Sequence, residues 1–170
     1  MSDSNFLPAV ACGAGKATVE SFAGKFAQSL GYEPGADLDP IVERFGGTIV
    51  YRSFADLGDS EDASVRVWDA GKFEIVLPDY TSLARDRFSI AHEIGHYVLH
   101  YPLVKAPMKA ARYGSTPVEW EANWFAAGFL MPEPLFREHH AAKKSPSALA
   151  RFFGVSNAAV TARTKSLRLA

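Results

Sequence analysis

Cysteine is almost absent from this 170-residue sequence, which contains Cys12 and no other. A single cysteine cannot form an internal disulfide, and such sparing use is typical of proteins in a reducing compartment. The sequence also lacks an uninterrupted apolar run near the ~20 residues that cross a bilayer. Its first residues carry no lysine or arginine ahead of a long apolar stretch, unlike a secretory signal. We therefore expect a cytoplasmic protein with no membrane partner.

A strong charge of either sign is missing too, since the formal net charge is -1. This balance excludes an overall field that would draw the protein to nucleic acid or to a membrane surface. Hydrophobic residues make up 48% of the chain and charged residues 22%, a composition typical of a folded globular protein. The length suits one compact domain with a short appended helical unit.

The first half of the chain predicts a leader, two helices and three strands. Residues 1–16 are rich in Ser, Gly and Ala and indicate a flexible leader. Apolar residues recur at helical spacing over 17–30 and, more briefly, over 38–45 before Gly46-Gly47. Strand-like runs follow at 48–52, 64–68 and 72–77, of which the last two form a predicted hairpin.

The second half of the chain is predicted to be helical. A helix over 81–101 ends at Pro102, and a loop over 102–115 leads to a helix over 117–130 that Met131-Pro132 stops. Two shorter helices follow at 146–153 and 157–167. The pattern indicates an α+β protein with a main domain over 17–135 and a helical segment over 136–170.

The segment His92-Glu93-Ile94-Gly95-His96 carries the clearest chemical signal. Residues four apart lie on one face of a helix, so His92 and His96 can each give one nitrogen to a zinc ion. Glu93 can reach a water in the open coordination position. Chance supplies about 0.01 such matches in a chain of this composition, and Gly95 is expected to leave room beside the metal. The alternative is a helix whose histidines only line a polar groove.

A third ligand would decide between these two interpretations. Glu119 opens the next predicted helix and shares a helical face with Asn123, which could orient a histidine ligand by a hydrogen bond. Glu121 points roughly the opposite way round that helix, so only one of the two carboxylates can face the zinc; we favour Glu119 and expect Glu121 to meet solvent. A competing role for Glu119 is a capping box that begins at Thr116.

The remaining histidines are not expected to bind the metal. His100 lies two turns, about 12 Å, from His92, which is too far for ligands of one ion. We expect a packing or solvent role for it. His139 and His140 lie in a charged segment and are expected at the surface.

Two blocks of sequence resemble the ImmA/IrrE family of bacterial and phage metallopeptidases. The first is 87–96, RFSIAHEIGH, and the second is 119–132, with EWEANWFAA and LMP. The resemblance extends over about 38–167. It implies a zincin-like fold with a small antiparallel, three-stranded sheet beside the metal helix. It also implies the ligands His92, His96 and Glu119, and a helix-turn-helix repressor as the protein substrate.

The resulting hypothesis is a zinc-dependent endopeptidase in which Glu93 is the general base. Two imidazoles and a carboxylate suit zinc but also accept manganese, cobalt or iron. Arg112 and Tyr113, in the loop before the second block, are candidates for stabilising the oxyanion. The strand over 73–77 could pair with an extended substrate if it lies at an edge of the sheet.

The competing hypothesis is a DNA-binding regulator or sensor whose metal is structural. Over 147–168, Ala150, Gly154 and Val160 have the spacing of a helix-turn-helix, in which Gly154 makes the turn. Basic side chains in the same segment could contact phosphates and give weak DNA binding: Arg151, Arg163, Lys165 and Arg168. The alternative for this segment is a helical pair that packs on the core or docks the repressor.

Overall fold

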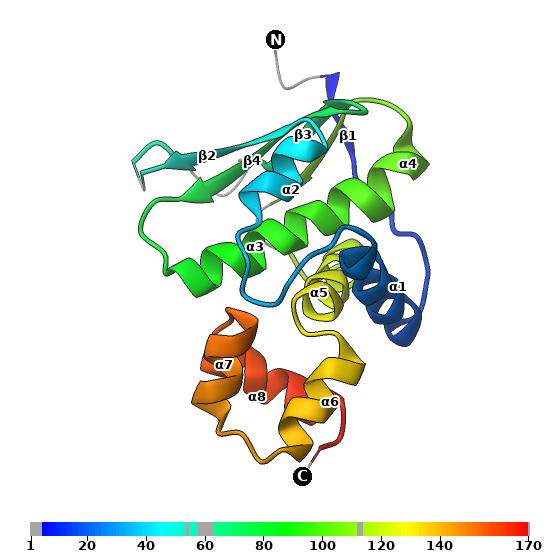
Figure 1. Ribbon diagram of the computed structural model, residues 1–170. Helices are drawn as coiled ribbons and strands as arrows, with labels where there is room; N and C mark the ends of the chain where they lie inside the picture. Colours follow the sequence, from blue (N-terminus) through cyan, green and yellow to red (C-terminus); the bar gives the residue numbers. More distant parts are fainter. Residues whose placement is uncertain (1–4, 54, 58–62, 112–113, 170) are drawn as a thin grey trace.

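A computed structural model describes residues 5–53, 55–57, 63–111 and 114–169. It confirms the α+β class, with a sheet on one side of a helical layer (Figure 1). The helices are α1 (Lys16–Ser29), α2 (Asp39–Arg44), α3 (Leu83–Gly95), α4 (Tyr101–Val104), α5 (Pro117–Leu130), α6 (Glu133–Ala141), α7 (Pro146–Phe153) and α8 (Asn157–Ser166). The strands are β1 (Leu7–Pro8), β2 (Gly47–Arg52), β3 (Ala63–Asp69), β4 (Lys72–Pro78) and β5 (Met108–Ala111).

The sheet is five-stranded and mixed, so the expected three-stranded antiparallel sheet is wrong. Its strand order is β1-β5-β3-β4-β2. Strand β3 is antiparallel to β4 and β5, whereas β2 is parallel to β4 and β1 is parallel to β5. The two missed strands are short, and β5 buries only Met108 and Ala110 on its inner face. Their pairing therefore depends on neighbouring strands more than on local sequence.

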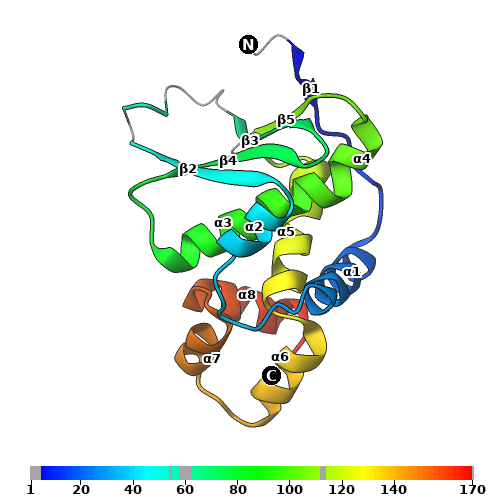
Figure 2. The ribbon, with the colours of Figure 1, turned by 45° about the horizontal axis from the view of Figure 1, so that its top comes forward.

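Strand β4 lies inside the sheet, between β3 and β2. Residues 73–75 are paired on both sides, and residues 76–77 are paired with β2, so β4 is not an edge strand to which a substrate strand could add. The strands at the two ends of the sheet are β1 and β2 (Figure 2). Strand β1 also gives part of the predicted leader a defined place, because the Leu7 amide donates to the Pro107 carbonyl at 2.8 Å.

Helices α3 and α5 cross beneath the sheet, and α1 lies alongside α5 (Figures 1 and 2). Ser82 begins α3 by accepting a hydrogen bond from the Arg85 amide. Ile90 and Ile94 of α3 enter the core together with Phe125 and Phe129 of α5. A Cβ at Gly95 would lie 3.1 Å from atoms of Phe125. The room that Gly95 leaves is therefore filled by Phe125, not by space beside a metal.

The helix that carries the histidines does not end at Pro102. After Gly95 the backbone widens into a π-helix over His96–His100, in which the Tyr101 amide donates to the His96 carbonyl, and α4 then continues to Val104. Proline lacks an amide hydrogen and clashes with the carbonyl four residues earlier in an α-helix. The wider π-turn just before Pro102 relieves both restrictions, so the helical path passes through it.

The C-terminal helices pack against the lower end of α3 and α5 (Figure 1). Helices α7 and α8 lie close to their predicted positions, and Gly154 joins them with a φ of 65°. Helix α6, which contains His139 and His140, was not predicted. No described helix is long and apolar enough to cross a membrane.

Candidate metal centre

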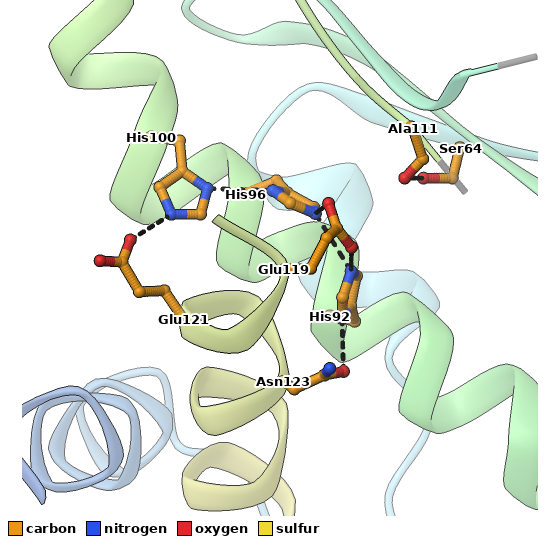
Figure 3. A network of polar contacts seen from close by, with 8 residues as sticks. All are labelled: Ser64, His92, His96, His100, Ala111, Glu119, Glu121 and Asn123. Carbon is orange, nitrogen blue, oxygen red and sulfur yellow. Dashed lines mark hydrogen bonds and ion pairs between the residues drawn. The ribbon is translucent and has the colours of Figure 1, made fainter. Parts of the chain in front are cut away.

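Three side chains from two helices converge beneath the sheet (Figure 3). The Nε2 atoms of His92 and His96 lie 3.0 Å apart. One oxygen of Glu119 lies 3.1 Å from Nε2 of His92, and the other lies 3.3 Å from Nε2 of His96. Donors bound tetrahedrally to one zinc at about 2.0 to 2.1 Å stand about 3.3 to 3.4 Å apart. The separations therefore fit donors to a single ion.

Asn123 fixes the ring of His92. Its Oδ1 lies 2.9 Å from Nδ1 of His92. An amide oxygen only accepts hydrogen bonds, so Nδ1 of His92 carries the proton and its Nε2 holds a lone pair. The helical register of Glu119 and Asn123 thus brings one side chain to each nitrogen of the same ring.

Glu119 contacts the two histidines and does not cap the start of α5. The Thr116 side chain makes no capping hydrogen bond within the described part of the chain. Glu119 is 7% exposed, and a Cβ at Gly114 would lie 3.0 Å from its Cγ. Gly114 thus lets the preceding loop pass close to the carboxylate. These contacts favour the ligand role over the capping-box alternative.

Glu93 is buried on the same helix as the histidines. One of its oxygens lies within 4.8 Å of a ring nitrogen of His92 and of His96. Its Oε2 is enclosed and has no hydrogen-bond partner among the described residues. Glu119 is the nearer carboxylate for the ligand position because both its oxygens lie within 3.3 Å of an imidazole nitrogen. An enclosed carboxylate oxygen without a partner suits Glu93 to accepting a proton from a water.

Electrostatic coupling within the site is strong. Burial alone would raise the pKa of Glu119, but the hydrogen bonds and charges of His92 and His96 outweigh it and lower the pKa to about 2. Burial opposes the charged form of His92, yet the hydrogen bond to Glu119 and the charges of Glu93 and Glu119 raise its pKa. The neighbouring carboxylates thus favour a positive charge at this position, as a bound cation would supply.

Two buried residues behind His96 were not identified as part of the site from the sequence. Nδ1 of His100 lies 2.9 Å from Nδ1 of His96, and Nε2 of His100 lies 2.9 Å from Oε2 of Glu121. His100 is fully buried and Glu121 is 2% exposed, so the expectation that Glu121 meets solvent is wrong. Burial and the neighbouring His96 lower the pKa of His100 to about 4. The sequence feature that indicates such a role is the repeated four-residue spacing from His92 to His96 and from His96 to His100.

A cleft of about 260 Å³ opens onto the site. It is lined by Tyr80, Arg85, Phe88, His92, Glu93 and Glu119, among others. A larger hollow of about 530 Å³ lies beside α8 and includes none of the converging side chains, although it shares Arg85 and Phe88 with the cleft. The smaller cleft is therefore the one that gives a substrate access to Glu93.

The other candidate residues either fall outside the described part of the chain or lie away from the centre. Arg112 and Tyr113 are outside the described residues. His139 is half-buried, with its ring centroid 4.0 Å from that of Phe152, and it belongs to the C-terminal helices. Arg163 was predicted as a phosphate contact, but it is 2% exposed and pairs with Glu20 at 2.8 Å. It therefore stabilises the core and is not on the surface.

An HExxH helix with a carboxylate from the following helix is the arrangement of zinc peptidases. The sequence matches the Peptidase_M78 family, described as the IrrE N-terminal-like domain, over residues 42–165. The chain belongs to this family, which confirms the predicted resemblance to ImmA/IrrE proteins. Among curated proteins, none matches the sequence.

Solved structures share the fold. One of them, a Mycobacterium tuberculosis transcriptional regulator, superposes with a TM-score of 0.59 at 20% sequence identity. The match covers 87% of this chain and 47% of the regulator. The present chain thus corresponds to less than half the length of that protein, and at this identity the likeness shows the fold alone.

Proposed function

We propose that this protein is a zinc-dependent endopeptidase of the ImmA/IrrE type with a zincin-like fold, and that it cleaves a helix-turn-helix transcriptional repressor. The observation that carries the proposal is the convergence of two imidazole nitrogens and a carboxylate, 3.0 to 3.3 Å apart. Membership of a metallopeptidase family supports the activity. The choice of substrate rests on the resemblance to ImmA/IrrE proteins.

The donor set fits a divalent metal ion. His92, His96 and Glu119 would hold it, and three protein ligands leave a coordination position open, as in catalytic zinc sites. Zinc suits two nitrogens and one carboxylate, although manganese or another divalent ion also accepts these donors. When bound, the ion supplies a Lewis acid and lowers the pKa of a water toward 7.

Residues of the chain have separate roles in proton transfer, in orienting a ligand and in excluding water. Glu93, with its enclosed Oε2, accepts the proton of the attacking water and passes it to the leaving amine. Asn123 keeps the proton of His92 on Nδ1 and so keeps Nε2 directed at the site. Burial of Glu93 and His96 excludes bulk water from the reacting groups.

The alternative is a DNA-binding regulator with a structural metal. Two observations favour it: α7 and α8 are joined at Gly154 as a helix-turn-helix would be, and the structurally similar mycobacterial protein is called a transcriptional regulator. The burial of Arg163 weakens it, because one of the four basic side chains proposed for phosphate contacts is enclosed. An open catalytic position beside Glu93 also has no use in a purely structural site.

The proposal is tested by incubating the zinc-loaded protein with purified helix-turn-helix repressors encoded beside its gene. We expect discrete fragments with zinc and none after chelation. Glu93→Gln should bind zinc as the wild type does and cleave about 100-fold or more slowly, because it cannot accept the proton. A Glu93→Gln variant that cleaves at the wild-type rate would contradict the general-base role.

A gel-shift assay at defined salt, run beside the cleavage assay, separates the two functions. Sequence-specific DNA binding by a protein that leaves every repressor intact would favour the regulator. Cleavage of a repressor, without a shift of its operator by this protein alone, would favour the peptidase.

A further inference from the structure

The structure contains a chain of hydrogen bonds, part-buried at Cys12 and Gly13 and buried at His100, that begins outside the family-matched region and ends at His96. The backbone amides of Cys12 and Gly13 donate to the two oxygens of Glu121, at 2.8 and 2.7 Å. Glu121 contacts Nε2 of His100, and His100 contacts His96 through the two Nδ1 atoms, each at 2.9 Å. In Figure 3, His100 and Glu121 lie to the left of His96, on the side away from His92.

The direction of each hydrogen bond follows from the first one. A carboxylate that receives two backbone amides acts only as an acceptor, so Nε2 of His100 must be the donor. A neutral His100 then holds its lone pair on Nδ1, and Nδ1 of His96 must carry the proton that links the two rings. Nε2 of His96 is consequently left with a lone pair, directed at Glu119 and His92.

We propose that His100 and Glu121, held by the amides of Cys12 and Gly13, are positioning residues that fix the tautomer and ring orientation of His96 for metal binding. This inference rests on the proposed metal site. Histidine ligands of metals commonly donate their second nitrogen to such a partner, and loss of the partner weakens metal binding. Here the partner is a second histidine, so the anchoring carboxylate lies one step further away.

The backbone explains how these groups reach each other. In the π-helix over His96–His100, the two histidines meet through their Nδ1 atoms. Gly13 has a φ of 75°, a left-handed conformation that glycine adopts without strain. This lets consecutive amides point at one carboxylate, 108 and 109 residues away in the sequence. The segment before α1 therefore contributes to the centre, although the family match begins only at residue 42.

The mutational test measures zinc affinity by competition with a chromophoric chelator. His100→Phe keeps the ring volume and removes the acceptor, so we expect zinc affinity to fall by about 10 to 100-fold. The absorption spectrum of the cobalt-substituted protein should change as well. His100→Asn places an amide oxygen near the position of Nδ1 and should retain most of the affinity. His139→Phe makes the same change at a half-buried histidine of α6, away from the centre, and is the matched control, with unchanged affinity expected.

A second measurement needs no variant. Nitrogen-15 spectra of the imidazoles in the zinc-loaded wild type should show His96 protonated at Nδ1 and His100 protonated at Nε2. The reverse tautomers would overturn the positioning role, as would a folded His100→Phe variant with wild-type zinc affinity and cobalt spectrum. A wild-type protein that binds no zinc would instead overturn the proposed function, so the two failures are distinguishable.

Discussion

Nε2 of His92 and Nε2 of His96 face each other at 3.0 Å, although each ring carries its proton on the opposite nitrogen. Glu119 places a carboxylate oxygen beside each of them. Three acceptors in such close contact require a cation between them. Burial opposes a second proton on His92, but the hydrogen bond to Glu119 and the charges of Glu93 and Glu119 outweigh it, favour this proton and raise the pKa of the ring.

Zinc and this proton compete, so zinc affinity should depend on pH. Below the raised pKa of His92, binding must release one proton, and the apparent affinity should rise about tenfold per pH unit. Above that pKa the dependence should level off, because Nε2 is already free. Chelator competition between about pH 5.5 and 8.5 measures the curve. His140→Gln, outside the site, should leave it unchanged, and a flat curve in the wild type would contradict the competition.

Asn123 offers a test of how His92 is oriented. Asn123→Leu removes the oxygen that accepts from Nδ1, and we expect zinc affinity to fall by about 10 to 100-fold. Asn123→Asp keeps an acceptor and adds charge, so its affinity should equal or exceed that of the wild type. Because Asn123 is exposed, neither change should alter the circular dichroism spectrum. Wild-type zinc affinity in the leucine variant would show that His92 is oriented by other contacts.

Features with local signals could be predicted from the sequence. Helix α5 occupies the predicted 117–130 because Pro117 starts it and Met131-Pro132 ends it. The convergence of His92, His96 and Glu119 could be predicted because helical spacing places both histidines on one face, and the next predicted helix opens with a suitable carboxylate. Strand β5 carries no comparable signal, since Lys109, Ala110 and Ala111 have little preference for strands and adopt one by pairing with β3.

The roles of His100 and Glu121 could not be predicted for a similar reason. The rise of an α-helix places His100 about 12 Å from His92 and so excludes it as a ligand of the same ion. Helix geometry alone does not reveal that His100 contacts His96 and Glu121. Glu121 does point away from Glu119, as expected. That side of α5 is covered by residues 12 and 13 instead of solvent, and only the tertiary structure shows this.

The crossing of α1 and α5 depends on Gly128. A Cβ at this position would lie 2.4 Å from the Glu20 carbonyl oxygen, so Gly128→Ala must push the helices apart. We expect a loss of about 1 to 3 kcal/mol in the free energy of unfolding, despite the better helix propensity of alanine. Gly24→Ala is the matched control, because its Cβ would meet Gly128 at an ordinary 3.4 Å. Urea unfolding compares them, and equal stability of both variants would contradict this account.

Arg87 lies on α3, the helix that carries His92, and connects it to the C-terminal helices. It is 6% exposed, and its guanidinium donates to the Gly154 carbonyl at 2.9 Å, to the Tyr32 hydroxyl at 2.6 Å and to the Ala36 carbonyl. Arg87→Met keeps an apolar stem like the arginine's inner methylenes but leaves the Gly154 and Ala36 carbonyls without their donor. We expect a loss of about 2 to 4 kcal/mol in the free energy of unfolding.

The same variant should reveal how far the C-terminal helices depend on the core. Gly154 connects α7 to α8, so loss of its hydrogen bond to Arg87 should speed amide hydrogen exchange first over 146–166. Arg85→Met, at an exposed position on the same helix, should change stability by less than about 0.5 kcal/mol. Uniform acceleration across the whole chain would mean that α7 and α8 unfold only together with the sheet, and that Arg87 stabilises one cooperative unit.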